Sequence, residues 1–167
     1  MTNSIILLGS SNSFGQTRKA IDIIIGNKDI PIIDLKTLDI SPYDYNHNNK
    51  DDDYFPLMKK VIEHDLIVLA TPVYWYSVSS FIKTFIDRLS DLLEIQKDLG
   101  RKLRGKKLFV IASFSTSLPE FFEKPIELTC EYMGIKYQGC SFIYNGEDLN
   151  LQQNNKAEII KAKEIIL

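Results

Sequence analysis

Short apolar runs alternate with stretches of helical periodicity along most of this chain. Apolar runs without polar alternation are typical of strands that are buried on both faces of a parallel sheet. Five such strands are expected at residues 5–8, 30–35, 66–70, 108–112 and 136–144. Five helices are expected between and after them, at residues 17–25, 55–64, 78–93, 119–133 and 156–166.

This alternation predicts an α/β sandwich with three layers, a five-stranded parallel sheet and helices on both faces, because each crossover returns the chain in the same direction. A doubly wound sheet in the order 2-1-3-4-5 fits a single domain of 167 residues, residues 1–167. The second strand then lies at an edge, where Pro31 is tolerated. Ligands of such sheets bind where the first and third strands end.

The loop that follows the first strand favours a bound phosphate group. It runs from Gly9 to Thr17, is rich in small polar residues and leads into a helix, so its backbone N–H groups and the helix dipole can converge on an anion. Five residues separate Gly9 from Gly15, and Gln16 stands where a Walker lysine would be. The loop therefore suits a terminal monophosphate that is held and not cleaved. An ordinary strand-to-helix connection is the alternative.

Three successive aromatic residues follow the third strand, in Pro72-Val73-Tyr74-Trp75-Tyr76-Ser77. Neighbouring side chains diverge, so at least one ring should reach the surface, where a flat ligand can stack on it. A phosphate loop beside an aromatic loop predicts bound FMN. Amides and hydroxyls at residues 113–117, after the fourth strand, could bond the pyrimidine edge of the flavin. Alternatively, the rings pack on the sheet or against another subunit.

Composition and charge exclude several other functions. A net charge of −2 without a basic tract argues against nucleic acid, and no apolar run is long enough to span a membrane or act as a secretory signal. Cys130 and Cys140 form neither a disulfide framework nor a metal cluster, so a cytoplasmic protein without a metal is expected. Asp51, Asp52 and Asp53 lack calcium-loop spacing and are interpreted as a solvated loop.

Two motifs together resemble a known family. They are Gly9-Ser10…Gly15-Gln16-Thr17 and Thr71-Pro72-Val73-Tyr74-Trp75-Tyr76-Ser77…Lys83…Phe85-Ile86-Asp87-Arg88. The chain thereby resembles the NAD(P)H-dependent FMN reductases of the flavodoxin-like fold, in its motifs from residue 4 to about residue 115 and in its layout to the end. The resemblance implies bound FMN, NADPH or NADH as reductant, a small electron acceptor such as free flavin, a quinone or an azo compound, and a homodimer or homotetramer.

The same resemblance implies a set of cofactor-binding residues. The phosphate would be held by Ser10, Asn12, Gly15, Gln16 and Thr17. The isoalloxazine would lie along Pro72, Val73, Tyr74 and Trp75, with Ser113 and Ser115 near its pyrimidine ring. Many members of the family have an arginine where Asn12 stands and glycines around Phe114, so the loop here lacks a cation and the pocket could be narrower.

The flavin carries the chemistry in this interpretation, so no catalytic side chain is expected and neither His47 nor His64 is assigned a role. Two alternatives stay open: a flavodoxin-like electron carrier that is not an enzyme, and a flavin-free binding protein of the same fold. The basic stretch 97–107 is either a solvated connection or a site for the phosphates of a nicotinamide cofactor. Asp87 and Arg88 are expected to form a helical ion pair or a subunit contact.

Overall fold

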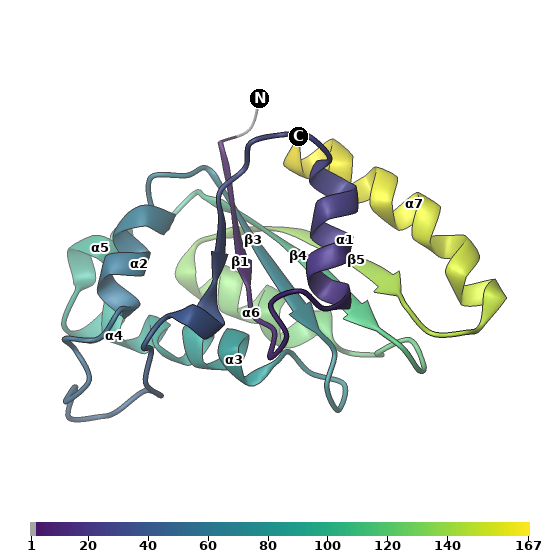
Figure 1. The fold of residues 1–167 in the computed structure, drawn as a ribbon. Helices are drawn as coiled ribbons and strands as arrows, with labels where there is room; N and C mark the ends of the chain where they lie inside the picture. Colours follow the sequence, from purple (N-terminus) through teal and green to yellow (C-terminus); the bar gives the residue numbers. More distant parts are fainter. Residues whose placement is uncertain (1–2) are drawn as a thin grey trace.

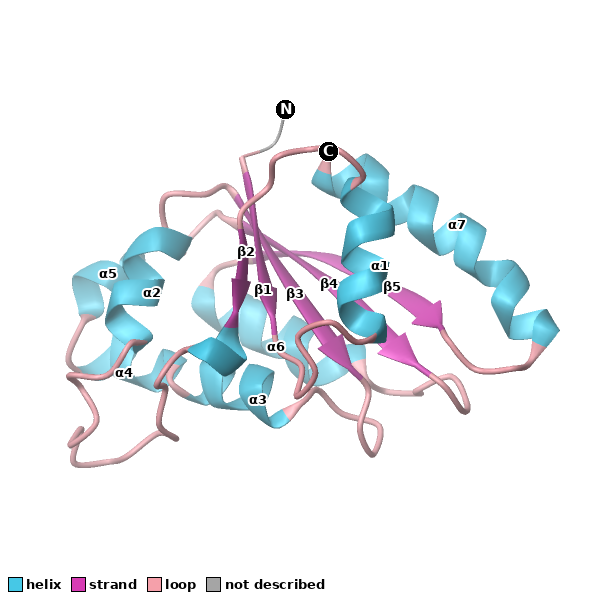
Figure 2. Cartoon of the chain, viewed as in Figure 1, coloured by secondary structure: helices cyan, strands magenta, loops and turns pink. Residues whose placement is uncertain are grey.

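The computed structural model describes residues 3–167 and contains a five-stranded parallel sheet (Figures 1 and 2). Its order β2-β1-β3-β4-β5 confirms the predicted order. The strands are β1 (Ser4–Leu8), β2 (Ile32–Asp34), β3 (Leu66–Pro72), β4 (Lys107–Phe114) and β5 (Lys136–Tyr144). Leu8 pairs with Ala70, and Pro72 pairs with Ser113, so the ends of β1, β3 and β4 lie along one edge of the sheet.

Helices cover both faces of the sheet (Figure 1). They are α1 (Gln16–Ile25), α2 (Tyr54–Val61), α3 (Ser80–Asp87), α4 (Leu89–Glu94), α5 (Lys97–Arg101), α6 (Glu123–Met133) and α7 (Leu149–Ile166), with a 3₁₀ turn η1 (Leu35–Thr37). Alternate residues of β1 serve the two faces. Ile6 and Leu8 pack in the core under α1 and α7, whereas Ile5 and Leu7 pack in the core under α2 to α6. This alternation is why β1 is apolar at every position except its first.

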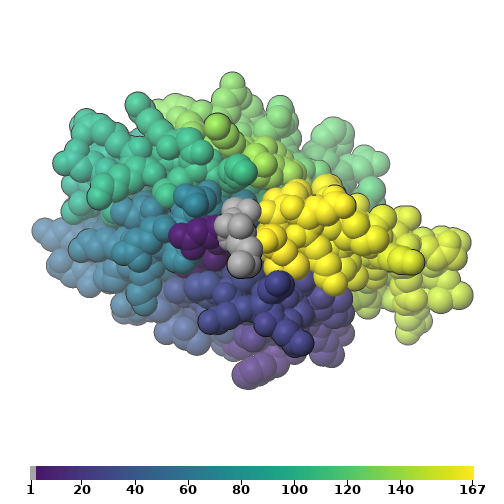
Figure 3. Space-filling model, turned by 90° about the horizontal axis from the view of Figure 1, so that it is seen from above, coloured from purple at the N-terminus to yellow at the C-terminus, as the bar shows by residue number. Residues whose placement is uncertain are grey.

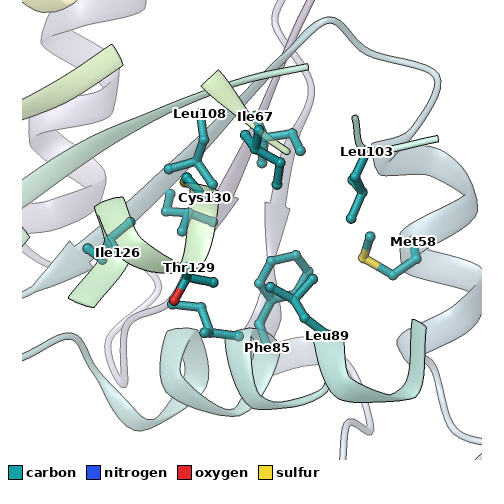
Figure 4. Close-up of a pocket in the computed structure, with 12 residues that line it drawn as sticks. Met58, Ile67, Phe85, Leu89, Leu103, Leu108, Ile126, Thr129 and Cys130 are labelled. Carbon is teal, nitrogen blue, oxygen red and sulfur yellow. The ribbon is translucent and has the colours of Figure 1, made fainter. Parts of the chain in front are cut away.

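The larger core contains one small void (Figure 4). Its volume is about 20 Å³, and its walls include Phe85, Leu108 and Cys130. The only hydroxyl in the lining, that of Thr129, donates to the backbone oxygen of Pro125 at 2.8 Å. A water would find too few polar partners there, so this void is a dry packing defect and not a ligand site.

Arg88 divides the helix predicted at residues 78–93 into α3 and α4. Its guanidinium is fully buried and pairs with Asp91 within the helical segment and with Asp52 from the loop between β2 and α2. It also donates to the backbone oxygen of Ser41 at 2.9 Å. The interpretation of Asp51, Asp52 and Asp53 as a solvated loop is therefore wrong for Asp52, because this carboxylate is the partner of a buried cation.

Other helix boundaries also differ from the prediction. The helix expected from residue 119 begins at Glu123, after a loop in which Phe121 has a left-handed φ of 61°. The last helix begins at Leu149 and not at residue 156, because the Asp148 carboxylate caps it by accepting from the amides of Asn150 and Leu151. The short helix α5 was not expected at all.

The first and last elements meet at the edge where the strands begin. The Ser4 hydroxyl donates to the backbone oxygen of Ile166 at 2.9 Å. Figure 3 looks down on this edge and shows the yellow end of α7 close to the start of β1. Among the described residues, none of the helices combines the length and hydrophobicity needed to cross a bilayer. The opposite edge of the sheet, where the strands end, carries both loops that the sequence analysis assigned to a cofactor.

Candidate functional site

The loop after β1 is fixed at its base by close packing. The Gly9 amide donates to the backbone oxygen of Ala70 at 2.8 Å, and the Gly9 oxygen accepts from the Ser79 hydroxyl at 2.6 Å. A Cβ at Gly9 would lie 2.4 Å from Cγ1 of Ile82, so only glycine lets α3 approach this closely. The sheet and α3 therefore hold the start of the loop in one position.

Hydrogen bonds within the loop leave a group of amides available. The Ser10 hydroxyl accepts from the Asn12 amide at 3.2 Å, and the Asn12 side-chain oxygen accepts from the Phe14 amide at 3.1 Å. Within residues 3–167, no acceptor is found for the amides of Ser13, Gln16 and Thr17. Such unpaired N–H groups at the start of a helix attract an anion. The loop thus fits a phosphate that is bound through the backbone.

Thr17 and Ser113 lie in contact. Their hydroxyl oxygens are 2.6 Å apart and both residues are buried, so the first turn of α1 is tied to the end of β4. Gly15 occupies the N-cap position of α1, and the Thr17 hydroxyl has Ser113 as its partner. The assignment of Ser113 to a flavin ring and of Thr17 to a phosphate stays a prediction.

The aromatic loop forms a two-residue hairpin. Tyr74 and Ser77 exchange two backbone hydrogen bonds of 3.0 Å, and the two residues between them, Trp75 and Tyr76, both have positive φ, 48° and 61°. Positive φ at both central positions is typical of a type I′ turn, which usually contains Asn and Gly. The turn holds Trp75 94% exposed. An oxygen–oxygen contact of 3.4 Å between the side chains of Ser11 and Tyr74 links this turn to the loop after β1.

A hollow of about 560 Å³ opens between the aromatic turn and the loop after β4. Its walls are Val73, Tyr74, Trp75, Tyr76, Phe114, Ser115, Thr116, Ser117 and Pro119. Most of these side chains are aromatic or small and uncharged, which is the lining that suits a planar ligand. The predicted residues Val73, Tyr74, Trp75 and Ser115 therefore share one hollow, and Pro72 ends β3 just behind it.

One cation near this site was missed by the sequence reasoning. The Lys36 ammonium, in η1, donates to the backbone oxygen of Ser11 at 2.7 Å. The signal was available, because the order 2-1-3-4-5 places the end of the second strand beside the end of the first. Lys36 supplies positive charge next to a loop that has Asn12 where an arginine is common.

The other titratable side chains that could take part in chemistry or binding lie away from the hollow. His47 pairs with Asp91 and Glu94, at 2.9 and 3.0 Å. Burial raises the pKa of the Cys130 thiol to about 12, inside the core. The basic stretch 97–107 leads into the amino end of β4, about 23 Å along an eight-residue strand from the hollow. That separation counts against its interpretation as the phosphate site of a nicotinamide cofactor.

Both loops and the hollow's Phe114 and Ser115 fall inside a family match. The sequence pattern of the NADPH-dependent FMN reductases matches residues 2–118. The chain belongs to this family. Its relatives include YwqN of Bacillus subtilis (strain 168), which is named as an NAD(P)H-dependent FMN-containing oxidoreductase and is 26% identical over 146 residues, covering 80% of each protein.

Solved structures of this family's fold superpose over nearly the whole chain. The Trp repressor binding protein from Bacillus subtilis matches with a TM-score of 0.76 at 19% identity, over 98% of this chain and 97% of its own. General stress protein 14 from Treponema denticola, solved in complex with FMN, matches with a TM-score of 0.66 at 17% identity, over 98% and 97%. At these identities the matches establish the flavodoxin-like fold that the resemblance implied.

Proposed function

We propose that this chain is an FMN-dependent oxidoreductase that takes electrons from NADPH or NADH and passes them to a small flat acceptor. The acceptor is a free flavin, a quinone or an azo compound. The observation that carries the proposal is the juxtaposition at one sheet edge of unpaired loop amides and an aromatic hollow. The two are joined through the contact between Ser11 and Tyr74. Family membership supports the same chemistry.

The residues present fit FMN. The amides of Ser13, Gln16 and Thr17 would bind its phosphate, with Lys36 adding charge from the side. The aromatic turn would support the ring system, and the walls of the hollow would keep water from one of its faces. Bound FMN supplies two-electron transfer between a reduced nicotinamide and an acceptor. The protein's own part is to bind and orient, so the proposal assigns no catalytic acid or base.

The first experiment is a visible spectrum of the purified protein followed by anaerobic addition of NADPH. A flavin spectrum that bleaches supports the proposal. A flavin that NADPH and NADH leave oxidised points instead to an electron carrier. A colourless protein that does not bind added FMN points to a flavin-free binding protein. Assembly as a homodimer or homotetramer is part of the proposal, because large rings such as Trp75 and Phe121 are 94% and 86% exposed in the isolated chain.

A substitution at Gln16 tests the phosphate assignment. Gln16 is the first residue of α1, where proline is tolerated, and Gly15 before it is already extended, as proline requires. Gln16→Pro therefore removes one N–H donor and leaves the helix intact. Loss of one charge-assisted hydrogen bond should weaken FMN binding by roughly 10- to 100-fold. Gln16→Ala keeps the amide and is the matched control.

The two variants distinguish a phosphate contact through the backbone amide of Gln16 from one through its side chain. If Gln16→Pro binds FMN as tightly as the unaltered protein, the phosphate does not sit on this amide and the assignment is wrong. If Gln16→Ala weakens binding as much as Gln16→Pro, the side chain and not the backbone is the contact. Circular dichroism checks that both variants are folded.

A further inference from the structure

A second hollow lies directly beside the first. It has a volume of about 490 Å³ and shares one wall, the buried Pro119, with the aromatic hollow. Its other walls are Leu118, Glu120, Phe121, Phe122, Glu123, Lys124, Glu127, Tyr137 and Phe142. The two hollows are therefore neighbouring compartments along the loop that follows β4.

Aromatic rings run from one hollow to the other. Phe114, in the wall of the first hollow, contacts Phe142 edge-on, with ring centroids 6.4 Å apart. Phe142 in turn contacts Phe122 edge-on at 5.7 Å, and both of these rings line the second hollow. These three rings therefore join the two hollows through the core, with Phe114 and Phe122 buried and Phe142 half-buried. The ring that a ligand in the second hollow would meet most openly is that of Phe121.

The charge of the second hollow is negative. Three carboxylates line it, against a single cation, Lys124. The Lys124 ammonium is bound to the Glu127 carboxylate at 2.8 Å, which neutralises that pair. The Glu123 carboxylate accepts a 2.8 Å hydrogen bond from the Tyr137 hydroxyl, and within residues 3–167 no partner is found for the Glu120 carboxylate. Glu120 and Glu123 therefore keep their charge uncompensated.

The rim of this hollow has an unusual backbone. Phe121 adopts a left-handed φ of 61° and its ring is 86% exposed. A bulky residue in this conformation is uncommon, and such residues cluster at functional sites. The strain marks the segment between the two hollows as more than a connecting loop.

We propose that the second hollow binds the tail of an extended aromatic electron acceptor and selects neutral or cationic tails over anionic ones. The proposal rests on the proposed function, because the acceptor's flat head would stack on the open face of the flavin in the first hollow. The exposed Phe121 and the half-buried Tyr137 and Phe142 provide aromatic surface for the tail. Glu120 and Glu123 provide the charge selection. Anionic tails are repelled, and cationic tails are attracted.

The test uses two naphthoquinones with the same short alkyl arm, which ends in trimethylammonium in one and in sulfonate in the other. Dissociation constants are measured calorimetrically on the FMN-loaded, oxidised protein, with no reductant present, so the readout is binding and not turnover. Each exposed charge–charge interaction changes the dissociation constant by a few-fold at most. Both carboxylates strengthen binding of the cationic arm and weaken binding of the anionic arm. The cationic arm should therefore bind roughly tenfold more tightly at low salt.

Variants assign this preference to the hollow. Glu120→Gln with Glu123→Gln should bring the two dissociation constants to within about threefold of each other. Glu63→Gln removes the same charge from an exposed position just after α2, outside the hollow, and should leave the preference intact. Equal binding of both arms to the unaltered protein, or an unchanged preference in the double variant, would overturn the proposal.

The result is separable from that of the proposed function. Bleaching of the flavin by NADPH without any preference between the arms rejects the subsite and keeps the reductase. A charge preference that depends on Glu120 and Glu123, in a protein whose flavin neither NADPH nor NADH reduces, keeps the subsite and rejects the reductase.

Discussion

The backbone conformation of the hairpin at Tyr74–Ser77 should lower the stability of this protein. Its two central residues, Trp75 and Tyr76, are bulky and both have left-handed φ. The double substitution Trp75→Asn with Tyr76→Gly installs the residues that a type I′ turn prefers. We expect the variant to be more stable than the unaltered protein and worse at binding FMN, because the strained rings are those that line the hollow.

The magnitude follows from the backbone and the exposure. A residue with a Cβ in the left-handed region costs roughly 1–2 kcal/mol, and Asn and Gly reduce or remove that cost. The new glycine lowers the free energy of unfolding by about 0.5–1 kcal/mol, because it raises the conformational entropy of the unfolded chain. Little packing is lost, since Trp75 is 94% and Tyr76 62% exposed. The net gain is about 1–2 kcal/mol, or a rise in Tm of about 2–8 °C for a chain of this size.

Equilibrium urea unfolding of the flavin-free protein, followed by circular dichroism, measures this gain. Fluorescence is unsuitable because the substitution removes the only tryptophan. Trp75→Ala is the control: it deletes the ring but keeps a Cβ, so its stability should stay within about 0.5 kcal/mol of the unaltered protein. A double variant that is no more stable than the unaltered protein, or an alanine variant that gains as much, would refute the strain argument.

Three further substitutions should each give a defined result. Gly9→Ala pushes a Cβ into Ile82 and should lower the free energy of unfolding by roughly 1–3 kcal/mol, as measured by urea unfolding. Arg88→Met leaves the carboxylates of Asp52 and Asp91 without this cation. It should lower the free energy of unfolding, measured by thermal unfolding, by about 3–5 kcal/mol. Burial raises the pKa of Cys130 to about 12, so the folded chain holds this thiol neutral where an unfolded cysteine ionises near pH 8.5. Stability should therefore fall as pH rises from about 8.5 towards 12, and Cys130→Ala should make that fall shallower.

The sheet could be predicted because its signal is local. Apolar runs locate the strands, and the proline at position 31, immediately before β2, agrees with an edge strand. Some helix ends could not be predicted as well, because they depend on contacts distant in sequence, whereas the Asp148 cap of α7 is a local signal that the prediction missed. Asp52 meets Arg88 across 36 positions, and the polar start of α7 is held by Asn155, which bonds backbone groups of Tyr144.

The site was predictable to the level of loops but not of atoms. The two loops were found from residue type and position, and the structure places them in contact through Ser11 and Tyr74. Which hydroxyls face a ligand and which face each other is decided by packing, as the bond between Thr17 and Ser113 shows. Lys36 was not predicted as a site residue because it belongs to neither motif. It comes near the loop after β1 only through the order of the strands.

The pairing of Arg88 with Asp52 has a practical consequence for protein engineering. The segment between β2 and α2 has the composition of a spacer, and a designer who reads only the sequence would choose it for an affinity tag, a fused reporter or new chain termini. Any insertion that pulls Asp52 away would leave a guanidinium in the core short of one counter-charge. The exposed turn after α1, at Gly26 and Asn27, makes no contact with this cation and has open space around it, so it is the safer place to cut or to graft.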